Sequence, residues 1–85
     1  MRIFYTKHAE RKFKFLKALG LNISKTDIKD ALTHPDYFYK DTEREANVVI
    51  KKIDQNHNLR VVYSRENDII TVITFYPTKK GRYIK

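Results

Sequence analysis

The side chains that could do chemistry are histidine, arginine, lysine, tyrosine and carboxylates, because the 85 residues include no cysteine. A chain without cysteine has no thiol nucleophile, no thiolate metal ligand and no disulfide framework. The three histidines, His8, His34 and His57, are too far apart in sequence for a metal-binding spacing. Gly20 and Gly81 are the only glycines, which excludes a glycine-rich phosphate-binding loop. We therefore expect neither a metal nor a cofactor.

Two terminal clusters of basic residues account for the net charge of +8. Residues 1–20 have six bases against one acid, residues 76–85 have four bases and no acid, and the segment between them has eight bases against nine acids. Such clustering is typical of proteins that bind a polyanion, either a nucleic acid or an acidic protein. The alternative is a basic surface that only keeps a small protein soluble. The residues expected to contact a nucleic acid are Lys7, Arg11, Lys14, Lys79 and Lys80.

His8 is the histidine best placed for proton transfer. If Thr6 caps a helix, His8 lies in its first turn, where the helix dipole disfavours the protonated ring. A neutral imidazole could accept a proton there or donate a hydrogen bond to a phosphate. The alternative is that His8 packs on a sheet edge and bonds a strand carbonyl. We expect His34 at a helix end and His57 in a turn, neither with a catalytic role.

The chemistry-bearing residues must be positioned by an N-terminal strand, residues 2–5, and the helix that follows it. Ala9, Phe13 and Leu16 have the i, i+4, i+7 spacing of a buried stripe, which Phe15 and Leu19 widen. This pattern predicts a helix over residues 7–19 that Gly20 terminates. Its opposite side forms a basic ridge of Lys7, Arg11 and Lys14.

A second helix is predicted to follow Ser24 and to end at Thr33 or His34. Ser24 can cap it with Asp27 at the third helical position, and Ile23 and Ile28 have the spacing of a hydrophobic staple. Pro35 disfavours helical geometry in the residue before it, so the helix ends there. Its buried residues are expected to be Ile28, Ala31 and Leu32.

After Pro35 the pattern is that of extended chain. Residues 37–40, 46–53, 59–64 and 69–76 are rich in β-branched and aromatic residues and are separated by short polar turns, which favour antiparallel neighbours. Tyr37, Phe38 and Tyr39 could stack on nucleic-acid bases, or alternate between core and surface as an ordinary strand does.

The sequence thus predicts a single α+β domain over residues 1–85. Its order is β-α-α-β-β-β-β, with two helices packed on one face of a twisted antiparallel sheet. A basic tail is expected over residues 77–85. No segment has the length of uninterrupted apolar residues that a membrane span needs, and residues 1–20 lack the apolar segment of a secretory signal. We expect a soluble, cytoplasmic protein that does not bind membranes.

This layout resembles the RelE/ParE superfamily of small toxins. The resemblance is carried by Thr6, His8 and Ala9 at the start of a basic helix, by Pro35 after the second helix, and by the closing strand at residues 70–76. It covers essentially the whole chain. Within the superfamily, the opening with Thr6, His8 and Ala9 is similar to a branch related to the BrnT-like toxins. The resemblance implies a RelE-like fold with a basic open face. It also implies a metal-independent endoribonuclease, a hydrolase of the mRNA interferase type, that belongs to a type II toxin-antitoxin system.

The resemblance also implies partners and a catalytic set. The partners are RNA, often on the ribosome, and a small acidic antitoxin; a homodimer is also compatible. Cleavage of RNA without a metal needs a base for the 2′-hydroxyl, cations for the transition state and an acid for the leaving oxygen. By their positions in the family layout, Lys51, Arg60, Arg82 and Tyr83 match the cationic and phenolic groups, and either Tyr83 or His8 would transfer protons. Lys51 and Lys52 are adjacent and so point to opposite faces of a strand, and only one of them can reach the site.

Two other classes of function stay open. One is a non-catalytic basic module that binds nucleic acid through its terminal charges. The other is a protein-binding module on the same fold, whose partner is an acidic, antitoxin-like chain.

Overall fold

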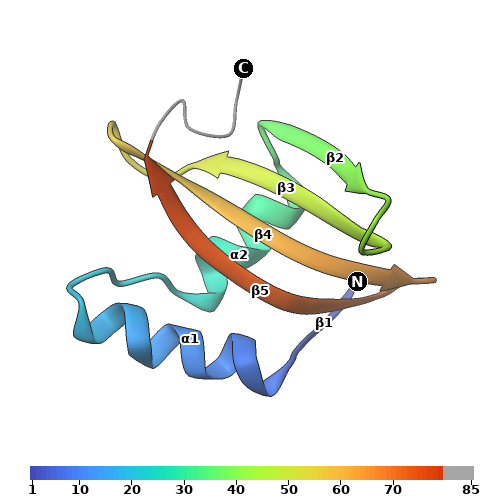
Figure 1. The fold of residues 1–85 in the computed structure, drawn as a ribbon, viewed down its shortest axis with the longest axis horizontal. Coiled ribbons are helices and arrows are strands. Elements are labelled where there is room, and N and C mark those ends of the chain that lie inside the picture. Colours follow the sequence, from blue (N-terminus) through green and yellow to red (C-terminus); the bar gives the residue numbers. More distant parts are fainter. Residues whose placement is uncertain (80–85) are drawn as a thin grey trace.

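The computed structural model describes residues 1–79, which form two helices and one five-stranded sheet (Figure 1). The strand order in the sheet is β1-β5-β4-β3-β2. The α+β class, the two helices and the order of elements are confirmed. The elements are β1 (Arg2–Tyr5), α1 (Lys7–Ala18), α2 (Lys25–Thr33), β2 (Tyr37–Asp41), β3 (Ala46–Lys52), β4 (His57–Glu66) and β5 (Ile69–Lys79).

Helix α1 begins at the predicted residue, Lys7, and ends at Ala18, one residue before the predicted end, with Leu19 as its C-cap. The Thr6 hydroxyl accepts a hydrogen bond from the Ala9 amide at 3.1 Å and donates one to the Ile73 carbonyl of β5 at 2.9 Å. One side chain therefore caps the helix and fastens it to the sheet. Gly20, at φ 84°, takes the left-handed conformation after the helix.

Helix α2 begins with the predicted capping box. The Ser24 hydroxyl accepts from the Asp27 amide at 3.2 Å, and the Asp27 carboxylate accepts from the Ser24 amide at 2.9 Å. Ile28 and Ala31 are fully buried against the sheet. Helix α2 crosses behind β3 and β4, whereas α1 lies along β5 (Figure 1).

The prediction of a wholly antiparallel sheet is wrong in one pairing. Strands β2 to β5 are antiparallel neighbours, but β1 pairs parallel with β5, with Tyr5 opposite Val72. The chain that leaves β1 passes through both helices and three strands before β5 returns beside it. A connection of that length permits parallel pairing, which a short turn does not.

Strand β5 contains a bulge at the place where α1 begins. Tyr63 of β4 faces Val72 while Val62 faces Thr74, so Ile73 is an extra residue. The bulge changes the alternation of the strand, and Phe75 therefore points into the same core as Val72. The bulge carbonyl is the one to which Thr6 donates.

Strand β5 also continues three residues beyond the predicted end at Tyr76. Pro77 faces Leu59 of β4 within this strand, although the basic tail was expected to begin there. Proline is tolerated because β1 pairs only with residues up to Val72, so the outer edge of β5 needs no amide donor at Pro77. The remainder of the expected tail lies outside the described residues.

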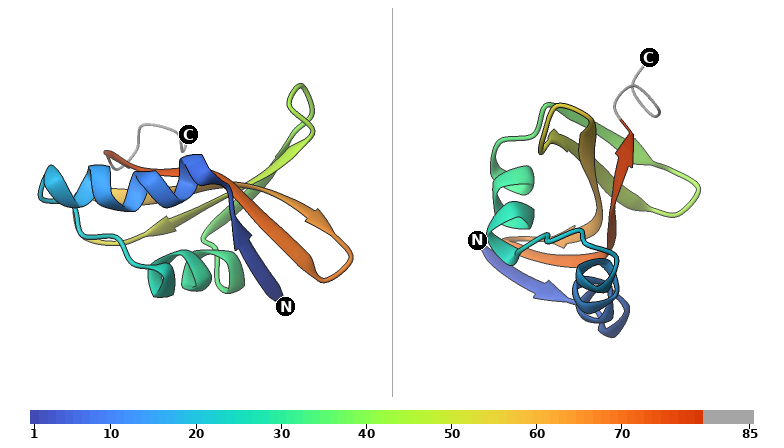
Figure 2. Two further views of the ribbon diagram at one scale, coloured as in Figure 1. Left: turned by 90° about the horizontal axis from the view of Figure 1, so that it is seen from below. Right: turned by 90° about the vertical axis from the view of Figure 1, so that its left-hand side faces the viewer.

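The main core is a single cluster to which both helices and the sheet contribute. Its fully buried members include Ala9, Ile28, Leu59 and Phe75, and Phe13 packs against Phe75 with ring centroids 4.5 Å apart. Figure 2 shows the strong twist of the sheet around this core. The predicted stripe of α1 is confirmed for Ala9 and Leu16.

The predicted widening of that stripe is wrong. Phe15 and Leu19 are 60% and 63% exposed. The reason is the position of α1 along β5: the sheet reaches only one narrow side of the helix, and neither residue has a partner layer among residues 1–79.

Candidate nucleic-acid interface

The sheet has a second face, which we call the Arg60 face. The strand register places Tyr37, Ile50, Arg60 and Tyr76 in one row across β2, β3, β4 and β5. Tyr39, two residues along β2, belongs to the same face. The same face also contains a small apolar cluster, separate from the main core, of Ala46, Val48 and Val62. The helix residues of the main core all lie on the other side of the sheet.

Arg60 is the centre of this face. Its side chain is largely covered, with the residue 7% exposed. Its Nε donates to the Tyr39 hydroxyl at 3.2 Å, and its two terminal nitrogens donate to Tyr39 and Tyr76. The guanidinium carbon also lies 5.8 Å and 5.3 Å from the centres of these two rings. Two phenols from opposite sides of β4 therefore fix one cation in place.

The electrostatics of the cluster favour the charged guanidinium. Burial on its own lowers the pKa of Arg60, but the hydrogen bonds and favourable electrostatics from Tyr39 and Tyr76 outweigh it, so the pKa lies above its ordinary value. Arginine has only donors, so each phenol oxygen must accept from it. A hydroxyl that accepts from a cation is a stronger donor of its own proton.

Helix α1 brings a further cation to the same place. The Lys12 ammonium lies 5.6 Å from the centre of the Tyr76 ring. Lys12 also lines a hollow of about 310 Å³ with His8, Arg11 and Phe15. His8 is exposed in the first turn of α1, and the carbonyl contact with the sheet that was one alternative for it is made by Thr6 instead. Lys12 connects the neighbourhood of His8 to the Arg60 cluster.

The structure does not bring the whole predicted catalytic set together. Lys51 faces Leu59 in the register, so it lies on the helix-packed side of the sheet, where its ammonium is 3.9 Å from Asp36. Lys52 is the neighbour that shares the Arg60 face. Arg82 and Tyr83, and Lys80 among the expected binding residues, lie outside the described residues.

The predicted binding residues are all at the surface where they are described. Lys7, Arg11 and Lys14 are exposed along α1, and Lys79 is exposed at the end of β5. The sequence reasoning overlooked Lys12, Tyr76 and the role of Tyr39 toward Arg60. Their one sequence signal is a lone arginine in an otherwise apolar run, residues 59–63, which needs polar partners when buried.

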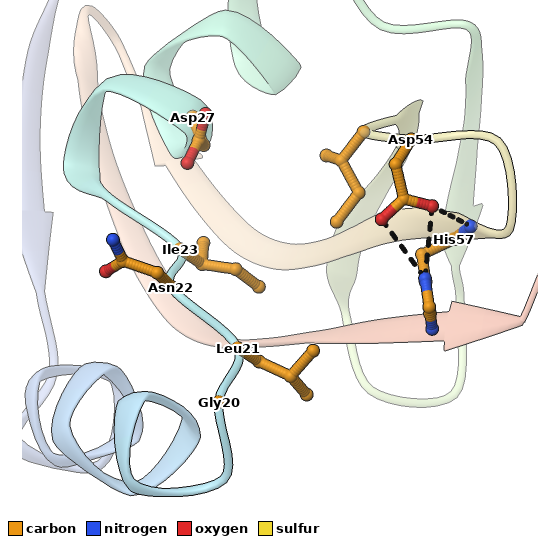
Figure 3. A pocket seen from close by; sticks show the side chains of 8 residues that line it. Gly20, Leu21, Asn22, Ile23, Asp27, Asp54 and His57 are labelled. Atoms are coloured by element: carbon orange, nitrogen blue, oxygen red, sulfur yellow. Dashed lines mark hydrogen bonds and ion pairs between the residues drawn. The ribbon is translucent and has the colours of Figure 1, made fainter.

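A second site lies at the other side of the molecule, between the α1–α2 connection and the β3–β4 turn (Figure 3). It is a pocket of about 310 Å³ in which the Asp54 carboxylate lies 3.1 Å from Nδ1 of His57. Backbone amides of Asn56 and His57 also donate to Asp54. The hydrogen bond from the Asn56 amide is the main cause that lowers the pKa of Asp54 below its ordinary value, and the hydrogen bonds from His57 lower it further. This geometry closes the turn and orients the imidazole. His57 was predicted to lie in the turn, but it is the first residue of β4, directly after it.

Residues 1–79 contain no group of three or more histidine and carboxylate side chains that could hold a metal ion. Within the same residues, neither helix is both long enough and apolar enough to cross a bilayer. Comparison of the chain with models of protein families, with curated proteins and with solved structures gave no match. The candidate site thus rests on the chain's own geometry: a covered arginine between two tyrosines, with a lysine beside one of them.

Proposed function

We propose that this protein is a toxin-type endoribonuclease that binds single-stranded RNA on the Arg60 face and cleaves it with its own side chains. The observation that carries the proposal is the cluster of Arg60, Tyr39 and Tyr76, a permanent cation fixed beside two phenols. Cleavage of a phosphodiester is mainly a matter of positioned charge and proton transfer. The RelE-like fold, the type II antitoxin system and the cytoplasmic location are part of the same proposal and rest on the sequence resemblance.

The surface around the cluster suits a single-stranded polyanion. Tyr37 and Tyr39 are 51% and 38% exposed on the Arg60 face and offer rings on which bases can stack. The basic ridge of α1 lies beyond Tyr76, on the side from which Lys12 reaches the ring. A strand of RNA can stack on the tyrosines of β2 while its phosphates follow Arg60 and Lys12 toward α1.

The proposed reaction is an internal transesterification. The ribose 2′-oxygen attacks the adjacent phosphorus, the bond from phosphorus to the 5′-oxygen breaks, and the products are a 2′,3′-cyclic phosphate and a 5′-hydroxyl. The proton of the 2′-hydroxyl goes to a base, and the leaving 5′-oxygen receives a proton from an acid. No oxidant, water or metal enters this step.

Each role has a candidate in the described residues. Arg60 and Lys12 stabilise the charge that develops on the phosphate oxygens. Tyr39, whose oxygen accepts from Arg60, donates its proton to the leaving oxygen. His8, in the hollow that Lys12 also lines, is the proposed base. Arg82 and Tyr83 remain predicted contributors, and Lys51 is left out because it lies on the other face.

The test is cleavage of end-labelled RNA at low protein concentration with a chelator present, both free and on ribosomes. We expect fragments with 5′-hydroxyl ends, a loss of about a hundredfold to a thousandfold in rate for Arg60→Lys, and no change for Lys29→Gln. Lys29 is a suitable control because it is an exposed lysine on α2, on the other side of the sheet. Absence of cleavage in both settings would reject the catalytic proposal.

A second candidate is RNA binding without cleavage, and the burial of Arg60 favours it. A guanidinium that is 7% exposed and bonded to two phenols can shape a binding surface without touching a phosphate. In this case RNA is retarded but stays intact, and affinity falls steeply with salt. Lys12→Gln should reduce the slope of log affinity against log salt by about one unit, whereas Lys29→Gln should leave it unchanged.

The proposed antitoxin would dock on α1. Phe15 is 60% exposed beside Arg11 and Lys12, so an apolar ring stands among cations. That combination fits an acidic chain with an apolar side chain to place in the hollow. Phe15→Ala should weaken capture of such a partner while leaving RNA binding on the Arg60 face intact.

A further inference from the structure

Strand β2 is an edge strand with aromatic side chains exposed on both of its faces. Tyr37 and Phe38 are 51% and 53% exposed, and Tyr39 is 38% exposed. Strand β3 pairs with one side of β2, and no strand within residues 1–79 pairs with the other. An edge that combines unpaired backbone groups with exposed aromatic rings is a template for another strand.

The sequence of this edge is complementary to itself when two copies run antiparallel. The five residues from Asp36 to Lys40 read Asp-Tyr-Phe-Tyr-Lys. With Phe38 opposite Phe38 of a second copy, Tyr37 faces Tyr39 of the second copy, and Asp36 faces its Lys40. Directly opposite residues point to the same face of an antiparallel pair, so aromatic rings meet aromatic rings and opposite charges meet.

The charges support this register. Asp36 and Lys40 lie on the same side of β2 as Phe38 by alternation. Lys40 is exposed and has no ion pair among residues 1–79. The Asp36 carboxylate, directly before β2, accepts a hydrogen bond from the Lys52 amide at 2.8 Å and lies 3.9 Å from the Lys51 ammonium. The group is still 43% exposed, which leaves room for a further cation. A twofold axis at Phe38 forms the pair of Asp36 with Lys40 twice, once on each side of the axis, and likewise the pair of Tyr37 with Tyr39, as in isologous interfaces.

We propose that β2 pairs with β2 of a second copy of this chain about a twofold axis at Phe38. The pairing joins two five-stranded sheets into one continuous sheet. The two Arg60 side chains then share one face, five interstrand spacings apart, or roughly 24 Å. An interface made of two five-residue strands is at the small end of specific interfaces, so the dimer forms reversibly, at protein concentrations on the order of 10 to 100 μM.

Cysteine cross-linking tests the register directly, because the chain has no cysteine of its own. In the proposed pairing the Cα atoms at position 38 lie about 4.5 to 5.5 Å apart across the axis, within disulfide range. The two copies of position 40 lie about 14 Å apart, out of range. Phe38→Cys should therefore give a covalent dimer in a glutathione redox buffer, whereas Lys40→Cys and the exposed α1 variant Phe15→Cys should not.

Sedimentation of the cysteine-free protein supplies the second measurement. The wild type should shift from monomer to dimer over about 1 to 500 μM, and Phe38→Lys, which sets two like charges against each other, should remain monomeric with an unchanged far-UV spectrum. A wild type that stays monomeric over the whole range would overturn the proposal. So would cross-linking at position 40 that is as fast as at position 38.

Discussion

The two faces of the sheet are built from the same strands but follow different rules. On the helix-packed face, Leu59, Val61 and Phe75 are fully buried among apolar neighbours from both helices. On the other face, Arg60 lies between Leu59 and Val61 in β4 and is hydrogen-bonded to Tyr39 and Tyr76. The first face accounts for why the chain folds. The second contains a polar cluster that folding alone does not require.

Energetics sharpen this contrast. Covering a guanidinium removes it from water at a free-energy cost, which its hydrogen bonds to two phenol oxygens and its contacts with their rings must offset. Apolar side chains of similar volume often replace buried charged groups with no loss of stability. Ile50, opposite Arg60 on β3, and Val62, two residues along β4 on the same face, would accept an apolar residue as a neighbour. Packing alone therefore does not explain an arginine at this site, and we propose that it serves RNA recognition or cleavage.

The largest expected effect is on the helix-packed face. Phe75→Ala removes a fully buried ring that packs against Phe13 at a tilt, and should lower the free energy of unfolding by about 3 to 5 kcal/mol. Phe15→Ala is the matched control, since that ring is 60% exposed and its loss should change stability by less than about 0.5 kcal/mol. Urea denaturation of both variants gives the answer. Equal losses would mean that the core is assigned to the wrong side of α1.

The next prediction concerns the Arg60 face, where a substitution should change activity and leave stability nearly unchanged. Arg60→Met should keep the melting temperature within a few degrees of the wild type, because the side chain stays long and packs beside Ile50. The rate of RNA cleavage should fall by about a hundredfold, the loss expected when a positioned charge is removed. A variant that melts far below the wild type would instead make Arg60 a structural residue of the sheet.

A smaller effect concerns the junction between α1 and β5. Thr6→Ala removes both the cap on the Ala9 amide and the bond to the Ile73 carbonyl, and should cost about 1 to 2 kcal/mol. Thr6→Ser keeps the hydroxyl and should cost much less. Thermal melts of the two variants measure the difference, and equal losses would show that the methyl group matters more than the hydrogen bonds.

The smallest effect appears at alkaline pH. Burial raises the pKa of Tyr63 above its ordinary value near 10, so the unfolded chain loses this proton first. The stabilisation of the neutral phenol is fully present below about pH 10 and is lost as pH rises through the folded-state pKa. Tyr63→Phe should therefore reduce the fall in melting temperature above that pH. Burial and the charge of Glu10 also raise the pKa of Tyr5, so Tyr5 should account for part of the fall that remains. An identical alkaline fall in wild type and variant would contradict this assignment.

Local signals made much of the fold predictable. Thr6, Ser24 with Asp27, and Gly20 each act within a few residues of their own position, and each marks a helix boundary where the sequence places it. The four antiparallel strands follow from alternation and short turns in the same way. The parallel pairing of β1 depends on where a long connection brings the chain back, which local pattern does not determine.

The candidate site was predictable only in part for a related reason. Arg60 stands out in the sequence, but its hydrogen-bond partners Tyr39 and Tyr76 are 21 and 16 residues away. Whether they reach it depends on strand register, and a shift of one residue would move either ring to the opposite face. The separation of Lys51 from Arg60 follows from the same alternation.

The central claim is that RNA binds the Arg60 face, and backbone and side-chain NMR shifts on titration with a short single-stranded RNA test it most directly. We predict that the largest shifts occur at Arg60 Nε, at Tyr39 and Tyr76 and along α1 near Lys12, with α2 and the pocket of Asp54 and His57 unaffected. Shifts concentrated at that pocket or on α2, or a spectrum unchanged by RNA, would contradict the account.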